Sequence, residues 1–424
     1  MKNIFYQMRL SFAIVLLVGV LFPASVSFAK DDTHKPITEE LIRLVEQNPE
    51  IELLLTTSLA EAKKVNPDKK TNPAQTLSDY YAYLDSAVEL IPMEVLKDPS
   101  NLLREQIMQS LCYFYFIIDQ PLPSLEGKGL YNNTLQYFEP FSTWTRNFAK
   151  AWGQFLDTDA SWSQATYQGF YNDPRFGLQE KWYEPASNWK TFNDFFSKYL
   201  QSPEQRPIAS PGDPSVVTAP ADSVPQGIWS IDKDSRIEVD GGLKVKMTRF
   251  YSVQDLLSDD SPYKNVFANG VLTHTFLDVN DYHRYHFAVA GTIKETKIIQ
   301  QNVSLEVVWN EIEGKYAPID SLGWQFTQTR GYVIMDMGKY GLVALIPMGM
   351  AQVSSVNFEG NVRPGITHEK GGMLGNFLFG GSDFIMLFQD KAGFKITAEK
   401  TEGTTDESYK HLLMGEAYGV MNGQ

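Results

Sequence analysis

The spacing of apolar residues changes partway along this 424-residue chain, and that change limits the folds open to it. Up to about residue 185 the apolar residues recur at helical spacing, with prolines between the runs. From Gly227 onward the apolar and β-branched runs are short and separated by turn residues. We therefore predict an α+β protein, with a helical N-terminal domain followed by a mainly antiparallel β domain of sandwich or barrel type. The helical runs are 53–62, 77–95, 101–118 and 148–156, and the strand runs are 236–250, 271–278, 284–289, 291–299, 303–308, 331–337, 341–347 and 384–388.

The first 29 residues have the layout of a secretory signal peptide. Lys2 and Arg9 supply a basic start, residues 10–22 are almost wholly apolar, and Ser27-Phe28-Ala29 fits a small-x-small cleavage site. The apolar stretch is shorter than the ~20 residues that span a bilayer comfortably. We therefore expect an exported protein, periplasmic or secreted, with a membrane-associated form as the alternative if the segment is kept as an anchor.

The charge of the chain is acidic. The formal net charge is −14, and removal of residues 1–29 takes away two positive charges and leaves −16. An acidic surface argues against a nucleic-acid partner, because such binding depends on neutralising phosphates. It also argues against simple docking on anionic lipid, although a local patch could still provide peripheral membrane contact. The apolar segment 111–118 is one candidate for such a patch, although a buried helix explains this segment better.

Cysteine and histidine usage gives no sign of a disulfide or a metal site. The single cysteine, Cys112, cannot form an internal disulfide, and no histidine or basic residue lies near it in sequence, which indicates a buried, unreactive thiol. His283 and His286 are three residues apart, but no cluster of cysteines and histidines accompanies them. We therefore expect no metal cofactor.

Gly380-Gly381-Ser382 places an unhindered carbonyl before a hydroxyl nucleophile. A serine hydroxyl needs a nearby base, and the distant segment 281–286, which reads Asp-Tyr-His-Arg-Tyr-His, offers two histidines. One interpretation is chemistry on the chain itself. Ser382 would attack the Gly381 carbonyl, the peptide would rearrange to an ester, and elimination would leave a pyruvoyl group at position 382. The alternative interpretation is an ordinary Gly-Gly-Ser turn.

These two segments belong to a longer series of short segments in a fixed order. In chain order they are 195–200 (Phe-Phe-Ser-Lys-Tyr-Leu), 206–208, 219–223 (Ala-Pro-Ala-Asp-Ser), 251–257, 267–270, 281–286, 289–291, 370–371, 374–377 and 380–382. Together they resemble the phosphatidylserine decarboxylase family, and the resemblance covers about residues 186 to 400. It implies a decarboxylase whose cofactor is a covalent pyruvoyl group made from Ser382.

The resemblance also implies roles for three residues in self-cleavage. His286 would deprotonate Ser382, and Asp222 would orient His286 and stabilise its charge, as in a hydroxyl–imidazole–carboxylate triad. Cleavage between Gly381 and Ser382 would produce a large β chain and a small α chain that stay together. The α chain would contain the 43 residues 382–424.

Three further residues are candidates for work on the substrate. We assign His283 as the proton donor in decarboxylation, because an imidazole titrates near working pH, and a structural histidine is the alternative. Arg284 and Arg330 are weaker candidates for binding a substrate carboxylate or phosphate, and surface salt bridges explain them as readily.

The chain departs from the family pattern at three positions. Ser223 follows Asp222 where glycine is usual, Ala288 replaces proline, and Asp383 replaces the usual Thr or Ser after the cleavage serine. Asp383 either places a carboxylate beside the reacting group, where it would slow cleavage or alter amine binding, or is a solvent-facing strand residue.

The resemblance leaves the substrate open. We place a helical extension at 30–185 and the decarboxylase-like catalytic domain at 186–424, cleaved between 381 and 382. Phosphatidylserine, converted to phosphatidylethanolamine in phospholipid biosynthesis, is favoured by the intact Asp222 and the 281–286 box. A free aromatic amino acid such as tryptophan is favoured by the extension and by residues 377–382, which resemble a branch that includes fungal enzymes. A catalytically silent binding protein is the third hypothesis.

Overall fold

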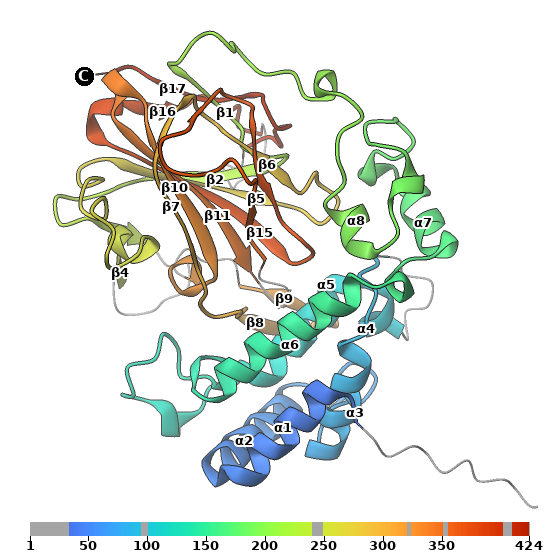
Figure 1. Ribbon diagram of the computed structural model, residues 1–424. Helices are drawn as coiled ribbons and strands as arrows, with labels where there is room; N and C mark the ends of the chain where they lie inside the picture. Colours follow the sequence, from blue (N-terminus) through green and yellow to red (C-terminus); the bar gives the residue numbers. More distant parts are fainter. Residues whose placement is uncertain are drawn as a thin grey trace, which may run out of the picture. The chain divides into compact units, whose positions relative to one another are not determined.

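Helices form the N-terminal part of the structure and strands form the C-terminal part (Figure 1). The computed structural model describes residues 34–94, 101–239, 249–319, 324–350, 355–401 and 409–423. This order confirms the predicted α+β class. The helices are α1 (Pro36–Gln47), α2 (Pro49–Val65), α3 (Leu77–Ala87), α4 (Leu102–Glu105), α5 (Ile107–Ile118), α6 (Phe141–Leu156), α7 (Gln164–Tyr171) and α8 (Phe192–Phe196).

Local sequence explains where several of these helices begin. Pro36 and Pro49 open α1 and α2, in the first turn, where backbone N–H groups have no acceptor within the helix and the fixed φ of proline suits the helix. The Thr76 side chain caps α3 by accepting a hydrogen bond from the backbone N–H of Asp79. At α8, Thr191 and Asp194 form a capping box, which fixes the start of the short helix that leads toward the candidate site.

Helix α5 is the most deeply buried helix of the N-terminal part. Every residue from Leu111 to Ile118 is buried. One side of α5 meets the hairpin of β8 (Val307–Asn310) and β9 (Lys315–Pro318), where the Gln109 side-chain amide exchanges two hydrogen bonds of 2.8 and 2.9 Å with the Tyr316 backbone. The interpretation of segment 111–118 as a buried helix is therefore confirmed, and the segment is not a membrane-docking patch, because its apolar side chains form core.

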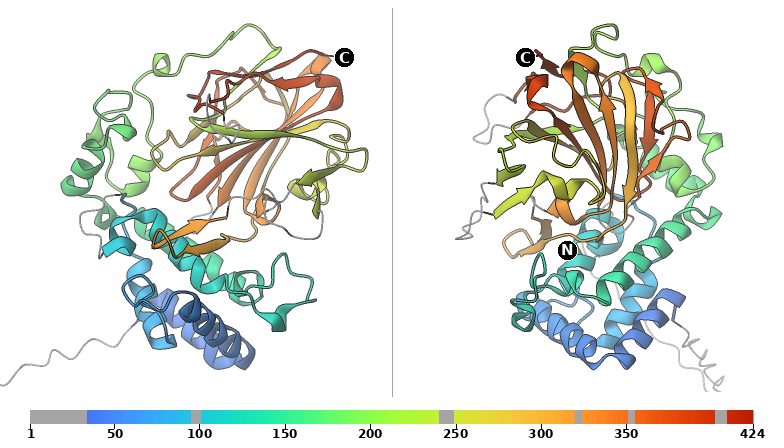
Figure 2. Two further views of the ribbon diagram at one scale, coloured as in Figure 1. Left: turned by 180° about the vertical axis from the view of Figure 1, so that it is seen from behind. Right: turned by 60° about the vertical axis from the view of Figure 1, so that its left-hand side comes forward.

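The central feature of the C-terminal part is an antiparallel sheet (Figures 1 and 2). Among the described residues, seven strands form it in the order β13-β7-β10-β11-β15-β5-β2. Strand β15, which contains Ser382, therefore lies inside the sheet between β11 and β5. The strands are β2 (Val224–Ser230), β5 (Val271–Leu277), β7 (Gly291–Ile299), β10 (Arg330–Asp336), β11 (Leu342–Met350), β13 (Thr367–His368) and β15 (Gly381–Phe388).

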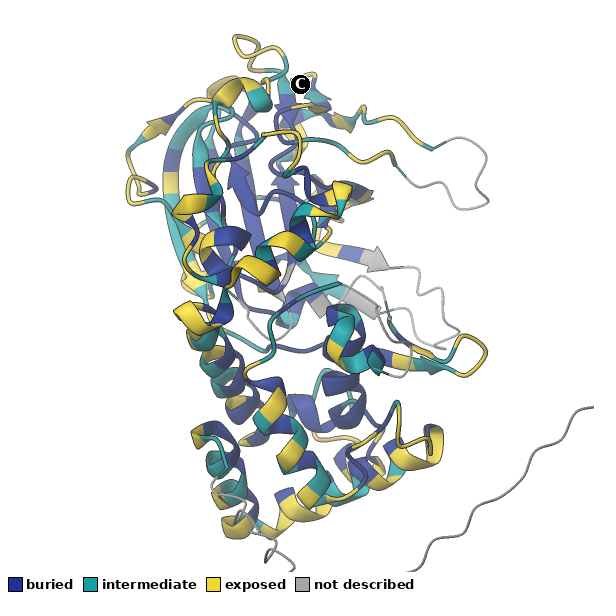
Figure 3. Ribbon diagram, turned by 90° about the vertical axis from the view of Figure 1, so that its right-hand side faces the viewer, coloured by how far each residue is buried: buried dark blue, intermediate teal, exposed yellow. Residues whose placement is uncertain are grey.

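Both faces of this sheet are covered, as the dark strands in Figure 3 show. On β15, Phe384 and Met386 belong to one core, whereas Ile385 and Leu387 belong to the core on the opposite face. Because side chains alternate between faces along a strand, burial on both faces explains why β15 reads as a continuous apolar run.

Smaller sheets surround the central one and carry parts of the candidate site. Strand β6 contains the end of the 281–286 box and pairs with β14 in the sheet β12-β14-β6. The remaining strands form the sheet β1-β17-β16 and the pair β3-β4. The strands are β1 (Val216–Thr218), β3 (Arg236–Val239), β4 (Arg249–Ser252), β6 (Arg284–His286), β12 (Asn357–Phe358), β14 (Met373–Asn376), β16 (Phe394–Ile396) and β17 (Ala417–Met421).

Several predicted boundaries differ from the structure or lie outside it; for example, the strand expected at 303–308 is β8 (Val307–Asn310). The helix expected at 77–95 ends earlier, at Ala87, and Pro92, which disfavours a helical conformation at the residue before it, prevents the helix from resuming. The proposed signal peptide, residues 1–29, lies outside the described residues. In the part that is described, no helix is both long and apolar enough to cross a bilayer. Residues 34–424 form one compact unit, and the proposed division near residue 186 stays a prediction.

Candidate active site

Ser382 lies at the start of β15 and is completely buried, with 0% of its surface exposed. Its neighbours across the sheet are Gly349 on β11 and Leu277 on β5. The Ser382 hydroxyl oxygen lies 3.3 Å from the Gly380 carbonyl oxygen and 3.5 Å from Nδ1 of His283. The predicted nucleophile is therefore shielded from solvent and has a histidine as its nearest possible base.

His283 precedes β6 and is held in one tautomer. Its Nε2 lies 3.4 Å from the Val279 carbonyl, which can only accept, so Nε2 carries the proton and the Nδ1 lone pair faces Ser382. The Phe196 ring stacks on the imidazole with the ring centroids 3.8 Å apart. Burial lowers the pKa of His283 to about 3, with a further contribution from the charge of Lys198. At neutral pH His283 is thus an uncharged group able to accept a proton.

His286, the base implied by the family resemblance, has other partners in this structure. Its Nδ1–H donates to the Gly371 carbonyl at 2.9 Å, and its Nε2 accepts from the Tyr282 hydroxyl at 3.3 Å. Burial lowers its pKa to about 4. Within the described residues, no hydrogen bond joins His286 to Ser382. Its role in cleavage therefore stays a prediction that this arrangement does not display.

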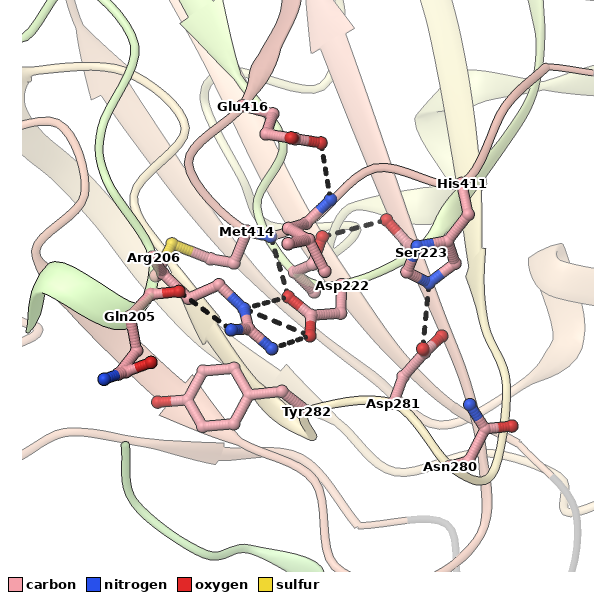
Figure 4. Close-up of polar contacts among 12 residues, drawn as sticks. Gln205, Arg206, Asp222, Ser223, Asn280, Asp281, Tyr282, His411, Met414 and Glu416 are labelled. Carbon is pink, nitrogen blue, oxygen red and sulfur yellow. Dashed lines mark hydrogen bonds and ion pairs between the residues drawn. The ribbon is translucent and has the colours of Figure 1, made fainter. Parts of the chain in front are cut away.

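Asp222 forms a buried ion pair with Arg206 rather than with a histidine (Figure 4). Arg206 donates from Nε at 2.9 Å and from Nη2 at 2.6 Å, so the pair is bidentate. The backbone N–H of Met414 donates a third hydrogen bond, 2.7 Å long, to Oδ1 of Asp222. Asp222 still acts electrostatically on His286, favouring its protonated form and opposing the larger effect of burial on its pKa. In the sequence, the Arg-Pro segment at 206–207 was the feature that could have identified Arg206 as the partner of Asp222.

Residues 411–416, which lie after the predicted cleavage point, pack against the loop that carries Asp222 (Figure 4). His411 Nε2 lies 2.8 Å from Oδ1 of Asp281, the first residue of the 281–286 box. Ser223 and Leu412 exchange two backbone hydrogen bonds of 2.8 Å. These contacts join the segments on the two sides of the predicted cleavage point, and sequence analysis did not identify His411 as part of the site.

The two candidate arginines have partners within the protein. Arg284 donates from Nε to the Ser197 carbonyl at 2.8 Å, and its guanidinium lies over the Tyr199 ring. Arg330 is buried on β10, and strand β11 separates β10 from the strand of Ser382. Its donors contact Gln301 and the backbone carbonyls of Asp255, Leu256 and Gln328. Binding of substrate by either arginine stays a prediction.

Asp383 is not the solvent-facing strand residue that was one of our two expectations. Its side chain is 0% exposed, and its Oδ2 lies 2.8 Å from Nε2 of His274 on β5. Because neighbouring residues on a strand point to opposite faces, this carboxylate lies on the face of the sheet opposite Ser382. Elsewhere in the described part of the chain, no group of three or more His, Cys, Asp or Glu residues is arranged to hold a metal ion.

Comparison with known proteins places this site inside a known sequence family. A family model described as phosphatidylserine decarboxylase matches residues 192–420, more than half of the chain. Decarboxylase iboD of Amanita muscaria is 27% identical over 281 residues, which cover 59% of this chain and 78% of that protein. Phosphatidylserine decarboxylase proenzyme 2 of Oryza sativa subsp. japonica is 32% identical over 212 residues, 49% of this chain and 31% of that protein. The phosphatidylserine decarboxylase proenzyme of Alcanivorax borkumensis is 28% identical over 280 residues, 62% of this chain and 88% of that protein.

Proposed function

This chain belongs to the phosphatidylserine decarboxylase family and is a carboxy-lyase, and we propose that it matures by cutting itself between Gly381 and Ser382. The observation that carries the proposal is the buried Ser382 hydroxyl beside the unprotonated Nδ1 of His283. A hydroxyl becomes a nucleophile when a base takes its proton, and a neutral imidazole is such a base.

We propose that maturation begins at this contact and proceeds in three chemical steps. His283 takes the Ser382 hydroxyl proton, and the oxygen attacks the Gly381 carbonyl carbon. The bond from that carbon to the Ser382 nitrogen then breaks as His283 returns the proton to this nitrogen, which converts the peptide bond to an ester with a free amine. Loss of the α-proton of residue 382 then expels the Gly381 carboxylate and leaves dehydroalanine. Water converts dehydroalanine to the pyruvoyl group and releases ammonia. The surroundings of position 382 fit such a group, because the site is fully buried and therefore protected from competing hydrolysis.

The pyruvoyl group supplies an electrophilic carbonyl that condenses with the substrate amine and withdraws electrons as carbon dioxide leaves. Side chains of the protein exclude water and move a proton. Phe196 and Phe379, whose ring centroids lie 5.2 Å apart, help to exclude water. His283, whose Nδ1 lies 3.5 Å from the Ser382 hydroxyl oxygen, is our candidate to deliver a proton to the substrate carbon.

We propose phosphatidylserine as the substrate, supported by the family match over residues 192–420 and by relatives that carry that name. A free aromatic amino acid is the second candidate, because aromatic rings of the helical part surround the site. Phe379 contacts Trp152 and Phe192 edge-to-face, with centroids 5.2 and 5.6 Å apart. Incubating the purified chain with phosphatidylserine vesicles or with L-tryptophan, and measuring carbon dioxide release, separates the two.

The same preparation tests the remaining proposals. A protein that runs as one uncut chain and releases no carbon dioxide from either substrate would be the silent binding protein instead. Export is proposed from the basic start and apolar stretch of residues 1–29. Fractionation of cells that express the full-length chain, followed by sequencing of the mature N-terminus, tests export and removal of the leader.

A further inference from the structure

Lys198 is a buried cation that the proposed chemistry does not use. It follows helix α8 and is 2% exposed. Its Nζ lies 4.7 Å from the centroid of the Tyr183 ring and 4.8 Å from that of Phe195. Throughout the part of the chain that the structure describes, no carboxylate or hydrogen-bond acceptor contacts this ammonium group.

The nearby carboxylates already have partners of their own. Asp222 and Asp281 both favour the charged form of Lys198, but Asp222 pairs with Arg206 at 2.6 Å and Asp281 pairs with His411 at 2.8 Å. Among these side chains, Lys198 is thus the one that has no carboxylate paired with it. Burial lowers the pKa of Lys198 to about 8. A buried ion without a counter-ion is strongly unfavourable, so this position is suited to receive an anion from outside the chain.

The position of Lys198 connects it to the candidate active site. Phe196, two residues earlier, stacks on His283, whose pKa is sensitive to the Lys198 charge. Tyr183, whose ring contacts the Lys198 ammonium, also lines a surface hollow of about 230 Å³. An anion entering past Tyr183 would therefore meet the ammonium next to the residues that surround Ser382.

We propose that the Lys198 ammonium binds the phosphodiester of a serine-phospholipid head group, an inference that rests on the proposed function and specifies its substrate class. The α-carboxylate is a poorer occupant, because an ion pair with a group that must leave as carbon dioxide stabilises the ground state and slows the reaction. The phosphodiester keeps its charge throughout the reaction. The serine side chain of the lipid separates the phosphodiester from the reacting carbon. Lys198 could therefore bind the phosphodiester while the amine is bound at position 382.

The experiment compares two amines that differ in the phosphodiester. Glycerophosphoethanolamine carries an amine and a phosphodiester, whereas ethanolamine carries the amine alone, and neither has a carboxylate. Each is trapped covalently on the cleaved protein with cyanoborohydride at pH 7, and mass spectrometry of the 43-residue chain gives the half-saturating concentration. The variants are Lys198→Met and Lys198→Arg, with Lys190→Met as a control at an exposed lysine of the same segment. Melting curves identify the folded variants, and Lys198→Gln replaces Lys198→Met if the latter does not fold.

Wild type should prefer glycerophosphoethanolamine, and Lys198→Met should reduce that preference at least about 30-fold, the usual effect of removing one partner of a buried charge pair. Lys198→Arg should keep most of the preference, and Lys190→Met should keep all of it. An unchanged preference in Lys198→Met would overturn the proposal. The proposal would also be overturned if Lys198→Met trapped L-serine more weakly than wild type but trapped glycerophosphoethanolamine equally well. That result would assign Lys198 to the α-carboxylate.

Failure of self-cleavage is measured separately. A gel shows directly whether wild type is cut, and an uncut wild type would refute the proposed function. Calorimetric titration of glycerophosphoethanolamine into the uncut Ser382→Ala chain, with and without Lys198→Met, still tests the anion site in that case. Tighter binding by the chain that retains Lys198 supports the inference, and equal binding overturns it.

Discussion

The Ser382 hydroxyl oxygen lies 3.5 Å from Nδ1 of His283. The two histidines of the 281–286 box therefore have different neighbours. His283 faces the predicted nucleophile, whereas His286 donates to the Gly371 carbonyl and accepts from Tyr282. Both rings are buried and have lowered pKa values, of about 3 and about 4. Both are therefore neutral at pH 7, and distance distinguishes them as bases for Ser382.

The first prediction separates the roles of these histidines. We expect His283→Ala to accumulate uncut precursor, because it removes the acceptor next to the hydroxyl, with a loss of about 10²–10⁴-fold in rate. His286→Ala should be cut faster than His283→Ala. Denaturing gels of samples taken over time give the rates. The opposite order, with His283→Ala cut and His286→Ala uncut, would restore the roles that the family resemblance implies.

The second prediction concerns the product of cleavage. Wild type should give two chains, and the smaller should have the mass of residues 382–424 with a blocked N-terminus, because the pyruvoyl group replaces the amino group. Ser382→Ala should stay a single chain without activity. Ser223→Ala is the matched control, since Ser223 is also buried but donates to the Ala221 carbonyl. An active, full-length wild type would rule out the mechanism.

The third prediction tests what Asp222 does. Asp222→Asn leaves Arg206 buried without a carboxylate and should lower the free energy of unfolding by about 3–5 kcal/mol. Adding Arg206→Met should recover most of that loss, because an apolar replacement of a buried pair is often close to neutral. Urea unfolding measures both. If the double variant is stable and still cuts itself, the carboxylate has no essential part in cleavage and the implied triad role is wrong.

The fourth prediction is a pH dependence from His411. The hydrogen bond and charge of Asp281 raise the pKa of His411, against a smaller opposing effect of burial. A raised pKa in the folded state gives stability that is complete below the unfolded pKa of about 6.5 and is lost as the pH rises through the folded value. Burial raises the pKa of Asp281, and the hydrogen bond and charge of His411 oppose that rise.

Melting temperatures between pH 6 and pH 9 test this assignment. Wild type should lose more stability over that range than His411→Gln, by less than about 1 kcal/mol because the His411 side chain is 40% exposed and screened by solvent. Lys410→Gln, at a neighbouring exposed ion pair, should follow wild type. Parallel curves for wild type and His411→Gln would show that this pair does not contribute.

The sequence predicted those features that depend on local patterns. Helical spacing before residue 185 and short apolar runs after Gly227 predicted the order of helices and strands. The series of short segments predicted that 281–286 and 380–382 belong to one site, and the Ser382–His283 contact brings them together. The ion pair of Asp222 and the burial of Lys198 against aromatic rings depend instead on tertiary packing. Arg206 lies 16 residues from Asp222, and the two form a pair because both are buried together.

The last prediction concerns Asp383, where sequence reasoning left two alternatives and the structure supports neither as stated. The carboxylate is buried beside His274, on the sheet face opposite the Ser382 side chain. Replacing one partner of such a pair destabilises the protein because the other loses a buried polar contact. We expect Asp383→Asn to lower the melting temperature. Cleavage should stay within about threefold of wild type, a change in barrier of less than about 1 kcal/mol.

A double-mutant cycle with His274→Ala and Asp383→Ala measures the coupling between the two side chains, apart from their other contacts. Strong coupling in stability, with cleavage almost unchanged in Asp383→Asn, would assign Asp383 to holding strands β15 and β5 together. A large acceleration of cleavage in a stably folded Asp383→Asn would mean that the carboxylate slows the reaction through the sheet. In that case the orientation of its side chain away from Ser382 would not be enough to separate it from the chemistry.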